Sequence, residues 1–145
     1  MTMIKRYDIA ESIPSPNDCV ITGISVEHDH MIFNFEKDLF NRESIQMIHP
    51  SAMSLIMRFH LVRYPQSDIY RLYARKLGKF HEGYRLMKEK TLFKLAGKKE
   101  KLTYLYHYVG SREMIIHLSG KSNYVLYVCA DSVDFEWVES MKYVL

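Results

Sequence analysis

The feature that most constrains the fold of this chain is a two-residue alternation of apolar side chains through its last third. Gly110-Ser111, Ser119-Gly120 and residues 130–132 divide this alternation into four runs. A spacing of two places each run on one face of a strand, and short gaps of Gly, Ser or Asp favour tight hairpins. The sequence therefore predicts an antiparallel meander of four strands, whose alternating residues are Leu102, Tyr104, Tyr106, Tyr108, Met114, Ile116, Leu118, Tyr124, Leu126, Val128, Val133, Phe135 and Trp137.

The strand pattern extends toward the N-terminus. Residues 20–26 and 31–35 alternate around a turn near His28-Asp29, which predicts a hairpin. Residues 53–61 and 68–77 predict two further strands, whereas residues 1–18 read as an extended arm that ends in a proline-containing loop. The run 122–129 is apolar on both faces, which predicts a central strand covered on one side by a helix or a second sheet.

Two stretches interrupt the alternation. Residues 88–96 have apolar residues at helical offsets and end before Gly97, which predicts a short amphipathic helix with a glycine C-cap. Leu39–Pro50 allows one helical turn, capped by Asn41, with Ile45 and Ile48 facing inward. We expect Gly78–Gly83 to be a loop.

The predicted fold class is therefore mainly β, bordering on α+β. About eight strands form an antiparallel sheet that is too large to stay flat, so we expect it to curl into a sandwich or a partly open barrel. The 145 residues predict a single globular domain, 1–145, long enough to bury roughly two-thirds of the surface that the unfolded chain exposes.

Composition narrows the setting in which the chain is expected to act. No apolar run approaches the ~20 residues that span a bilayer, and Asp8 stands where a signal peptide needs its apolar stretch. The two cysteines, Cys19 and Cys129, fit small core residues of a reducing compartment. We therefore expect a cytoplasmic protein without a membrane segment.

The formal net charge of +3 is unevenly distributed along the chain. Residues 58–101 carry thirteen Lys/Arg against four Asp/Glu, whereas the segments on either side are acidic on balance. A basic segment favours anionic partners, and a solvated polar face is the simpler alternative. The residues we expect to contact an anion or a nucleic acid are Arg71, Arg75, Lys76, Lys98 and Lys99.

Three histidines in predicted strands are candidates for a shared ligand site. His60, His107 and His117 each lie opposite the main apolar face, where neighbouring strands could bring them together with Glu113, or with Tyr70 and Arg71 of the basic segment. A general acid–base pair or a metal site is conceivable there, although solvent-facing histidines are ordinary. His28-Asp29-His30 could chelate a metal, but it lies at a predicted turn without a third ligand nearby.

The motifs of known catalytic and cofactor sites are absent from the sequence. No serine lies in a nucleophile elbow, no Gly-rich turn precedes a helix, and the cysteines lack zinc or redox spacing. We therefore assign no catalytic residue, cofactor or metal, and an enzyme is the less favoured interpretation.

A small binding protein remains as the leading hypothesis. It would contact a protein partner, or a second copy of itself, through a sheet face or the basic segment 58–101. One alternative is a nucleic-acid-binding protein in which aromatic and basic residues of that segment stack bases and hold phosphates. The other is a curled sheet that holds a metal or a small molecule, which could also be catalytic.

Overall fold

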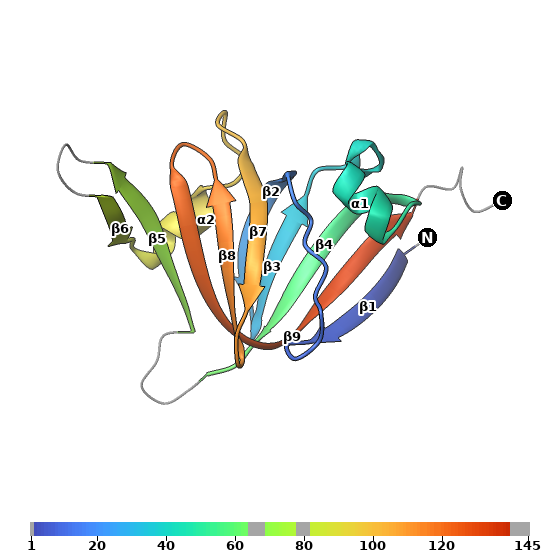
Figure 1. Ribbon diagram of the computed structural model, residues 1–145, viewed down its shortest axis with the longest axis horizontal. Coiled ribbons are helices and arrows are strands. Elements are labelled where there is room, and N and C mark those ends of the chain that lie inside the picture. The colour runs from blue at the N-terminus through green and yellow to red at the C-terminus, as the bar shows by residue number, and fades with distance from the viewer. Residues whose placement is uncertain (1, 64–68, 78–81, 140–145) are drawn as a thin grey trace.

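The computed structural model describes residues 2–63, 69–77 and 82–139, and these form one antiparallel sheet with two short α-helices (Figure 1). The helices are α1 (Glu43–Ile48), preceded by a 3₁₀ turn (Leu39–Asn41), and α2 (Glu89–Lys94). The strands in the described residues are β1 (Thr2–Asp8), β2 (Cys19–Glu27), β3 (His30–Phe35), β4 (Ala52–Leu61), β5 (Tyr70–Leu77), β6 (Glu82–Leu86), β7 (Leu102–Val109), β8 (Glu113–Ser119) and β9 (Asn123–Glu139). The predicted antiparallel, mainly β class is confirmed.

The sheet closes on itself through β9. Its strand order is β4-β3-β2-β7-β8-β9-β5-β6, and β4 also pairs with β9, so that six strands form a ring of hydrogen bonds. Consecutive strands form two meanders, β2-β3-β4 and β7-β8-β9. Strand β1 adds to the second half of β9, and the β5-β6 hairpin adds to its first half. The ring therefore has two extensions, both carried by β9.

Strand β9 is the main departure from the sequence prediction. We expected a hairpin at residues 130–132, but β9 runs unbroken for 17 residues. Its first half pairs with β8 and β5, and its second half pairs with β4 and β1. Opposite β4 the register skips Asp131, which is a bulge, and bulges bend a strand rather than end it. In Figure 1, β9 runs down one side of the molecule, turns at the bottom and rises on the other side.

The core lies between the inward faces of the ring strands. The alternation in β8 buries Met114, Ile116 and Leu118, and the corresponding residues of β9 include Leu126 and Phe135. Helix α2 contacts β2 and β5 and places Leu92 in this core. The face of β5 that carries Leu72 and Ala74 thus points inward, so its neighbours in sequence point outward.

The remaining segments confirm some predictions and correct others. Helix α2 lies within the predicted 88–96, and the hairpin of β2 and β3 is present. The arm at residues 2–8 is a full strand, and Glu82 and Gly83 of the loop expected at 78–83 belong to β6, whereas residues 78–81 lie outside the described residues. Helix α1 begins after Arg42 rather than after Asn41, and it buries Ile45 as expected.

A membrane-spanning helix is not found in the described residues, because neither α-helix has the length or the apolar character to cross a bilayer.

Candidate functional site

The outer face of the sheet formed by β6, β5, the first half of β9, β8 and β7 carries most of the partly exposed aromatic side chains. Strand register aligns them in rows across the sheet: Tyr73 lies opposite Leu86 and Val125, and Val125 lies opposite His117. A second row joins Tyr127, Ile115 and Tyr108. We call this surface the aromatic platform; it consists of Tyr73, Tyr84, Leu86, Tyr106, Tyr108, Ile115, His117, Val125 and Tyr127.

The rings of the aromatic platform support one another. Tyr106 stacks on His117 at a centroid distance of 4.5 Å, and Tyr108 meets the same imidazole edge-on at 6.0 Å. Tyr73 and Tyr127 form an edge-to-face pair at 5.5 Å. These geometries are the favourable ones for aromatic pairs. Burial lowers the pKa of His117, so its ring is neutral at pH 7 and the platform keeps an uncharged centre.

A depression of about 410 Å³ lies in the platform. Val125, Ile115 and Tyr127 come from the central strands, whereas Tyr84 of β6 and Tyr108 of β7 stand at the two sides. Tyr84 and Tyr108 are 53% and 60% exposed, so their rings are accessible to a ligand. The arrangement can receive an apolar or aromatic group against a largely apolar floor.

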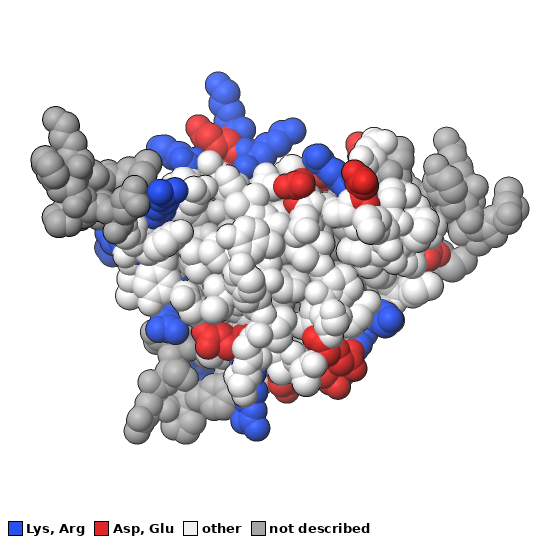
Figure 2. Space-filling view, in the orientation of Figure 1, with Lys and Arg blue, Asp and Glu red and all other residues white. Residues whose placement is uncertain are grey.

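Two arginines of β5 border the platform. The guanidinium of Arg71 lies over the ring of Tyr127 at 5.1 Å and 3.9 Å from the carboxylate of Glu113. Arg75 is exposed and lies opposite Tyr84 across the β5–β6 pair. In the view of Figures 1 and 2, β7, β8 and the first half of β9 face the reader, the surface over them is largely uncharged, and charged side chains gather toward its margins.

The structure separates the three predicted site histidines. His117 lies on the aromatic platform, whereas His60 lies on the outer face of β4 within a different set of contacts. His107 is on the core side of β7, between the Tyr104 hydroxyl and the Ile13 carbonyl. They do not converge, and of the five residues expected to share a ligand site only Arg71 and His117 lie on the same surface.

Tyr70 lies on the opposite side of β5 from Arg71. Its hydroxyl donates to the Glu89 carboxylate of α2, and its ring packs edge-on against Phe93. Burial, reinforced by Glu89, raises the pKa of Tyr70 well above its ordinary value. This tyrosine therefore joins α2 to the sheet.

The basic residues of segment 58–101 are spread over several parts of the molecule. Lys98 lines a small depression of about 140 Å³ with Leu102 and Tyr124, whose side chains belong to the core side of the sheet. Lys99 is exposed in the loop after α2, and the side chain of Lys76 lies outside the described part of the structure. Of the predicted anion-contacting residues whose side chains are described, only Arg71 and Arg75 border the platform.

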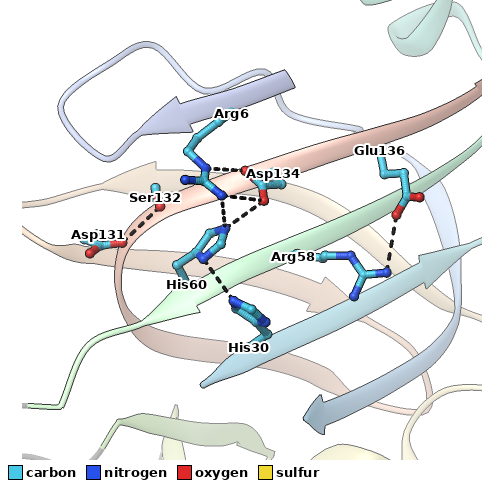
Figure 3. Close-up of polar contacts among 8 residues, drawn as sticks. All are labelled: Arg6, His30, Arg58, His60, Asp131, Ser132, Asp134 and Glu136. Carbon is cyan, nitrogen blue, oxygen red and sulfur yellow. Dashed lines mark hydrogen bonds and ion pairs between the residues drawn. The ribbon is translucent and has the colours of Figure 1, made fainter. Parts of the chain in front are cut away.

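His60 belongs to a polar cluster that joins β1, β3, β4 and β9 (Figure 3). Arg6 donates to both oxygens of Asp134, from Nε at 2.7 Å and from a terminal nitrogen at 3.2 Å. His60 Nε2 lies 2.7 Å from Asp134 Oδ2, and its Nδ1 lies 3.0 Å from Nε2 of His30. Burial alone raises the pKa of Asp134, but the hydrogen bonds from Arg6 and His60 outweigh it, so the pKa lies below its ordinary value.

The polar cluster is best explained as a structural link between neighbouring strands. Each contact crosses from one strand to another, and the Asp134 carboxylate is satisfied by both Arg6 and His60. The nearby Ser132 hydroxyl donates to Asp131 instead of to a histidine. Within residues 2–63, 69–77 and 82–139, no group of three or more His, Cys, Asp or Glu is arranged to hold a metal ion.

The cysteines do not supply a reactive site. Cys19 is buried, and burial raises the pKa of its thiol to about 11, so it is protonated at neutral pH. Burial also raises the pKa of Cys129. Both cysteine side chains are therefore consistent with packing in the fold.

Comparisons with known protein families, with curated proteins and with solved structures gave no match. The class that the fold and the site define is therefore a mainly β protein with an exposed aromatic sheet face, and functional argument depends on that face.

Proposed function

We propose that this chain is a binding protein that contacts a protein partner through its aromatic platform. The observation that carries the proposal is the outer face of β8 and of the first half of β9, where Val125, Tyr127 and Ile115 occupy the centre of a sheet. Central strands that are apolar on both faces are normally covered on both. The core covers one face of β9, and no described helix or strand covers the other.

The composition of the platform favours a protein over a nucleic acid. Protein interfaces are enriched in Tyr and Arg and depleted of Lys, Glu and Asp. The described side chains of the platform and its border include five tyrosines, Arg71 and Arg75, with Glu113 as the acidic neighbour. Nucleic-acid surfaces are much more strongly positive, whereas Lys98 of the basic segment lines a depression with core residues Leu102 and Tyr124.

Site-specific photo-cross-linking in the native cells tests the proposal. A benzoylphenylalanine placed at Tyr108, or separately at Tyr84, is expected to give one discrete adduct of higher mass whose added component is a protein. The matched control is the same group at Met47 of α1, which is 83% exposed and belongs to a different element. It is expected to give no such adduct.

The mass of the adduct identifies the kind of partner. A product of twice the mass of the chain indicates a second copy, and any other protein product indicates a heterologous partner; both support the proposal. Equal labelling at Met47 and Tyr108, or adducts that nuclease treatment removes, would contradict it.

A further inference from the structure

We infer that the depression in the aromatic platform receives an aromatic side chain of the partner that is flanked by carboxylates. This inference rests on the proposed function, and it specifies which chemistry of the partner is recognised. Binding energy in protein interfaces concentrates in a few aromatic or arginine anchors that fill desolvated pockets. The platform offers one such pocket and two arginines beside it.

The shape of the depression argues for a single aromatic anchor. Its volume of about 410 Å³ lies near the lower end of the ~300–1,000 Å³ range of ligand pockets, which admits one large side chain but no folded element. Val125 is 7% exposed, so the floor is already packed against its neighbours. Tyr84 and Tyr108 at the sides present rings that can stack on an inserted ring.

The charges beside the depression argue for neighbouring carboxylates. Arg75 forms no ion pair with the side chains that the structure describes, and the 3.9 Å separation of Arg71 from Glu113 is at the outer limit of such a pair. Arginine pairs well with carboxylates because its planar guanidinium donates two parallel hydrogen bonds. Arg71 and Arg75 are on the same strand and the same face, so one acidic segment beside the anchor can reach both.

Peptide titrations followed by amide NMR signals of the purified protein test the inference. The probes are acetyl-Asp-Trp-Asp-amide, its neutral Asn-Trp-Asn counterpart, its Lys-Trp-Lys counterpart, and an eight-residue thymidine oligonucleotide. We expect the acidic peptide to shift the signals of Ile115, Val125 and Tyr127 and to bind about three- to tenfold more tightly than the neutral peptide, since two partly exposed ion pairs contribute modestly. The basic peptide is expected to bind most weakly.

Variants distinguish the contribution of the aromatic residues around the depression from that of the two arginines. The double change Arg71→Gln and Arg75→Gln is expected to abolish the preference for the acidic peptide, so that this variant binds the acidic and the neutral peptide with equal affinity. Arg85→Gln is the matched control, because Arg85 lies on the other face of β6, opposite Ala74. The double change Tyr84→Ala and Tyr108→Ala is expected to weaken all three peptides at least tenfold.

The inference is overturned if no peptide shifts these signals, or if the acidic, neutral and basic peptides bind equally. It is also overturned if the oligonucleotide shifts the same signals at a lower concentration than the acidic peptide, which would identify a nucleic-acid surface. If cross-linking from Tyr108 captures a protein while the peptides fail, this inference falls and the proposed function stands. If the peptides bind as expected but cross-linking captures nothing, the proposed function falls.

Discussion

Trp137 shows how one side chain fastens the second half of β9 to the molecule. Its indole is 2% exposed and stacks on the ring of His49, with centroids 5.0 Å apart and planes 7° from parallel. His49 in turn contacts the Glu139 carboxylate at 2.6 Å, so the ring below the indole is held in place. The sequence predicts this burial from the alternation with Val133 and Phe135, and the structure confirms it.

Trp137→Ala is expected to lower the free energy of unfolding by about 3–5 kcal/mol, because it leaves a cavity in a packed core. Chemical denaturation followed by circular dichroism measures this. Ile4→Ala on β1, where the side chain is 63% exposed, is the control and is expected to change stability by less than ~1 kcal/mol. A loss below 1 kcal/mol for the tryptophan variant would mean that the indole does not pack as described.

His107 makes the stability of the protein sensitive to mild acid. Burial lowers the pKa of His107, although the hydrogen bond to the Ile13 carbonyl opposes this. Nε2 donates to that carbonyl at 3.1 Å, and Nδ1 lies 2.6 Å from the hydroxyl of buried Tyr104. A neutral imidazole makes both contacts, because one of its nitrogens donates and the other accepts. Below the unfolded pKa of ~6.5 the unfolded chain takes up a proton that the folded state does not, so folding is disfavoured.

We therefore expect the free energy of unfolding to fall as the pH decreases from 7.5 to 5.5, by at most ~1.4 kcal/mol per pH unit for one such histidine. His117, whose pKa burial also lowers, acts in the same direction. Urea unfolding at several pH values measures this. His107→Gln is expected to flatten the dependence, and an unchanged slope in that variant would contradict the assignment.

The three tyrosines of β7 show what residue-level prediction misses. Tyr104, Tyr106 and Tyr108 were expected on one face, but the register shifts between Tyr104 and Tyr106. Tyr104 is therefore buried, and the other two are exposed on the platform. In the local sequence Tyr-Leu-Tyr-His-Tyr, either set of alternate residues can face the core, because each set contains side chains that pack well when buried. The sequence therefore does not reveal where a bulge lies.

At the scale of elements, β9 organises the sheet. Its first half lies between β8 and β5 and its second half between β4 and β1, so most of its backbone is hydrogen-bonded on both edges. Strands β1 and β6 each pair on one edge in the described residues. Local opening is easiest where few contacts must break.

Hydrogen exchange is accordingly expected to be slowest for the amides of β9 around Leu126 and Phe135 and fastest among the strands for β1 and β6. Exchange measured by NMR or mass spectrometry on the native protein tests this ranking. Exchange of the second half of β9 as fast as that of β1 would contradict the central position of this strand.

The polar cluster ties β1 to the ring through Asp134. The pKa of Asp134 is lowered, so its contribution is present above the unfolded value of ~3.9 and is lost as the pH falls through the folded value. Asp134→Asn is expected to lower the free energy of unfolding at pH 7 by about 1 kcal/mol, a small amount because the Arg6 side chain is 61% exposed.

The difference between wild type and Asp134→Asn is expected to shrink as the pH falls below the unfolded value of ~3.9, because Asp134 of the unfolded chain then takes up a proton that the paired carboxylate of the folded state does not. Thermal unfolding at pH 7 and pH 3 measures both values. A difference of equal size at the two pH values would show that charge is not what the carboxylate contributes.

The strands were largely predictable from the sequence. Their boundaries were not, because residues typical of turns and loops are held in strands by pairing with neighbouring strands. Ala130-Asp131-Ser132 resembles a turn, yet pairing on both sides keeps it extended and turns it into a bulge. The first two residues of β6, Glu82 and Gly83, were expected in a loop because they lack apolar alternation, and an edge strand needs little of it.

At the scale of the whole molecule, the aromatic platform is a product of topology. Its residues come from β5, β6, β7, β8 and β9, which the ring of strands brings side by side. Arg71, Arg75 and His117 were identifiable in advance as candidates, whereas Tyr84, Ile115 and Val125 were not assigned to a common site. The signal in the sequence was the run 122–129, which is apolar on both faces and whose outer face no described helix or strand covers.

The most direct measurement of the central claim is the affinity of the captured partner for the purified protein and for the double variant Tyr84→Ala and Tyr108→Ala. The account predicts a dissociation constant at least 100-fold higher for this variant, with unchanged stability, because exposed aromatic anchors dominate interfaces. Met47→Ala is expected to bind like wild type. A double variant that binds the partner as tightly as wild type would contradict the claim that this face is the binding surface.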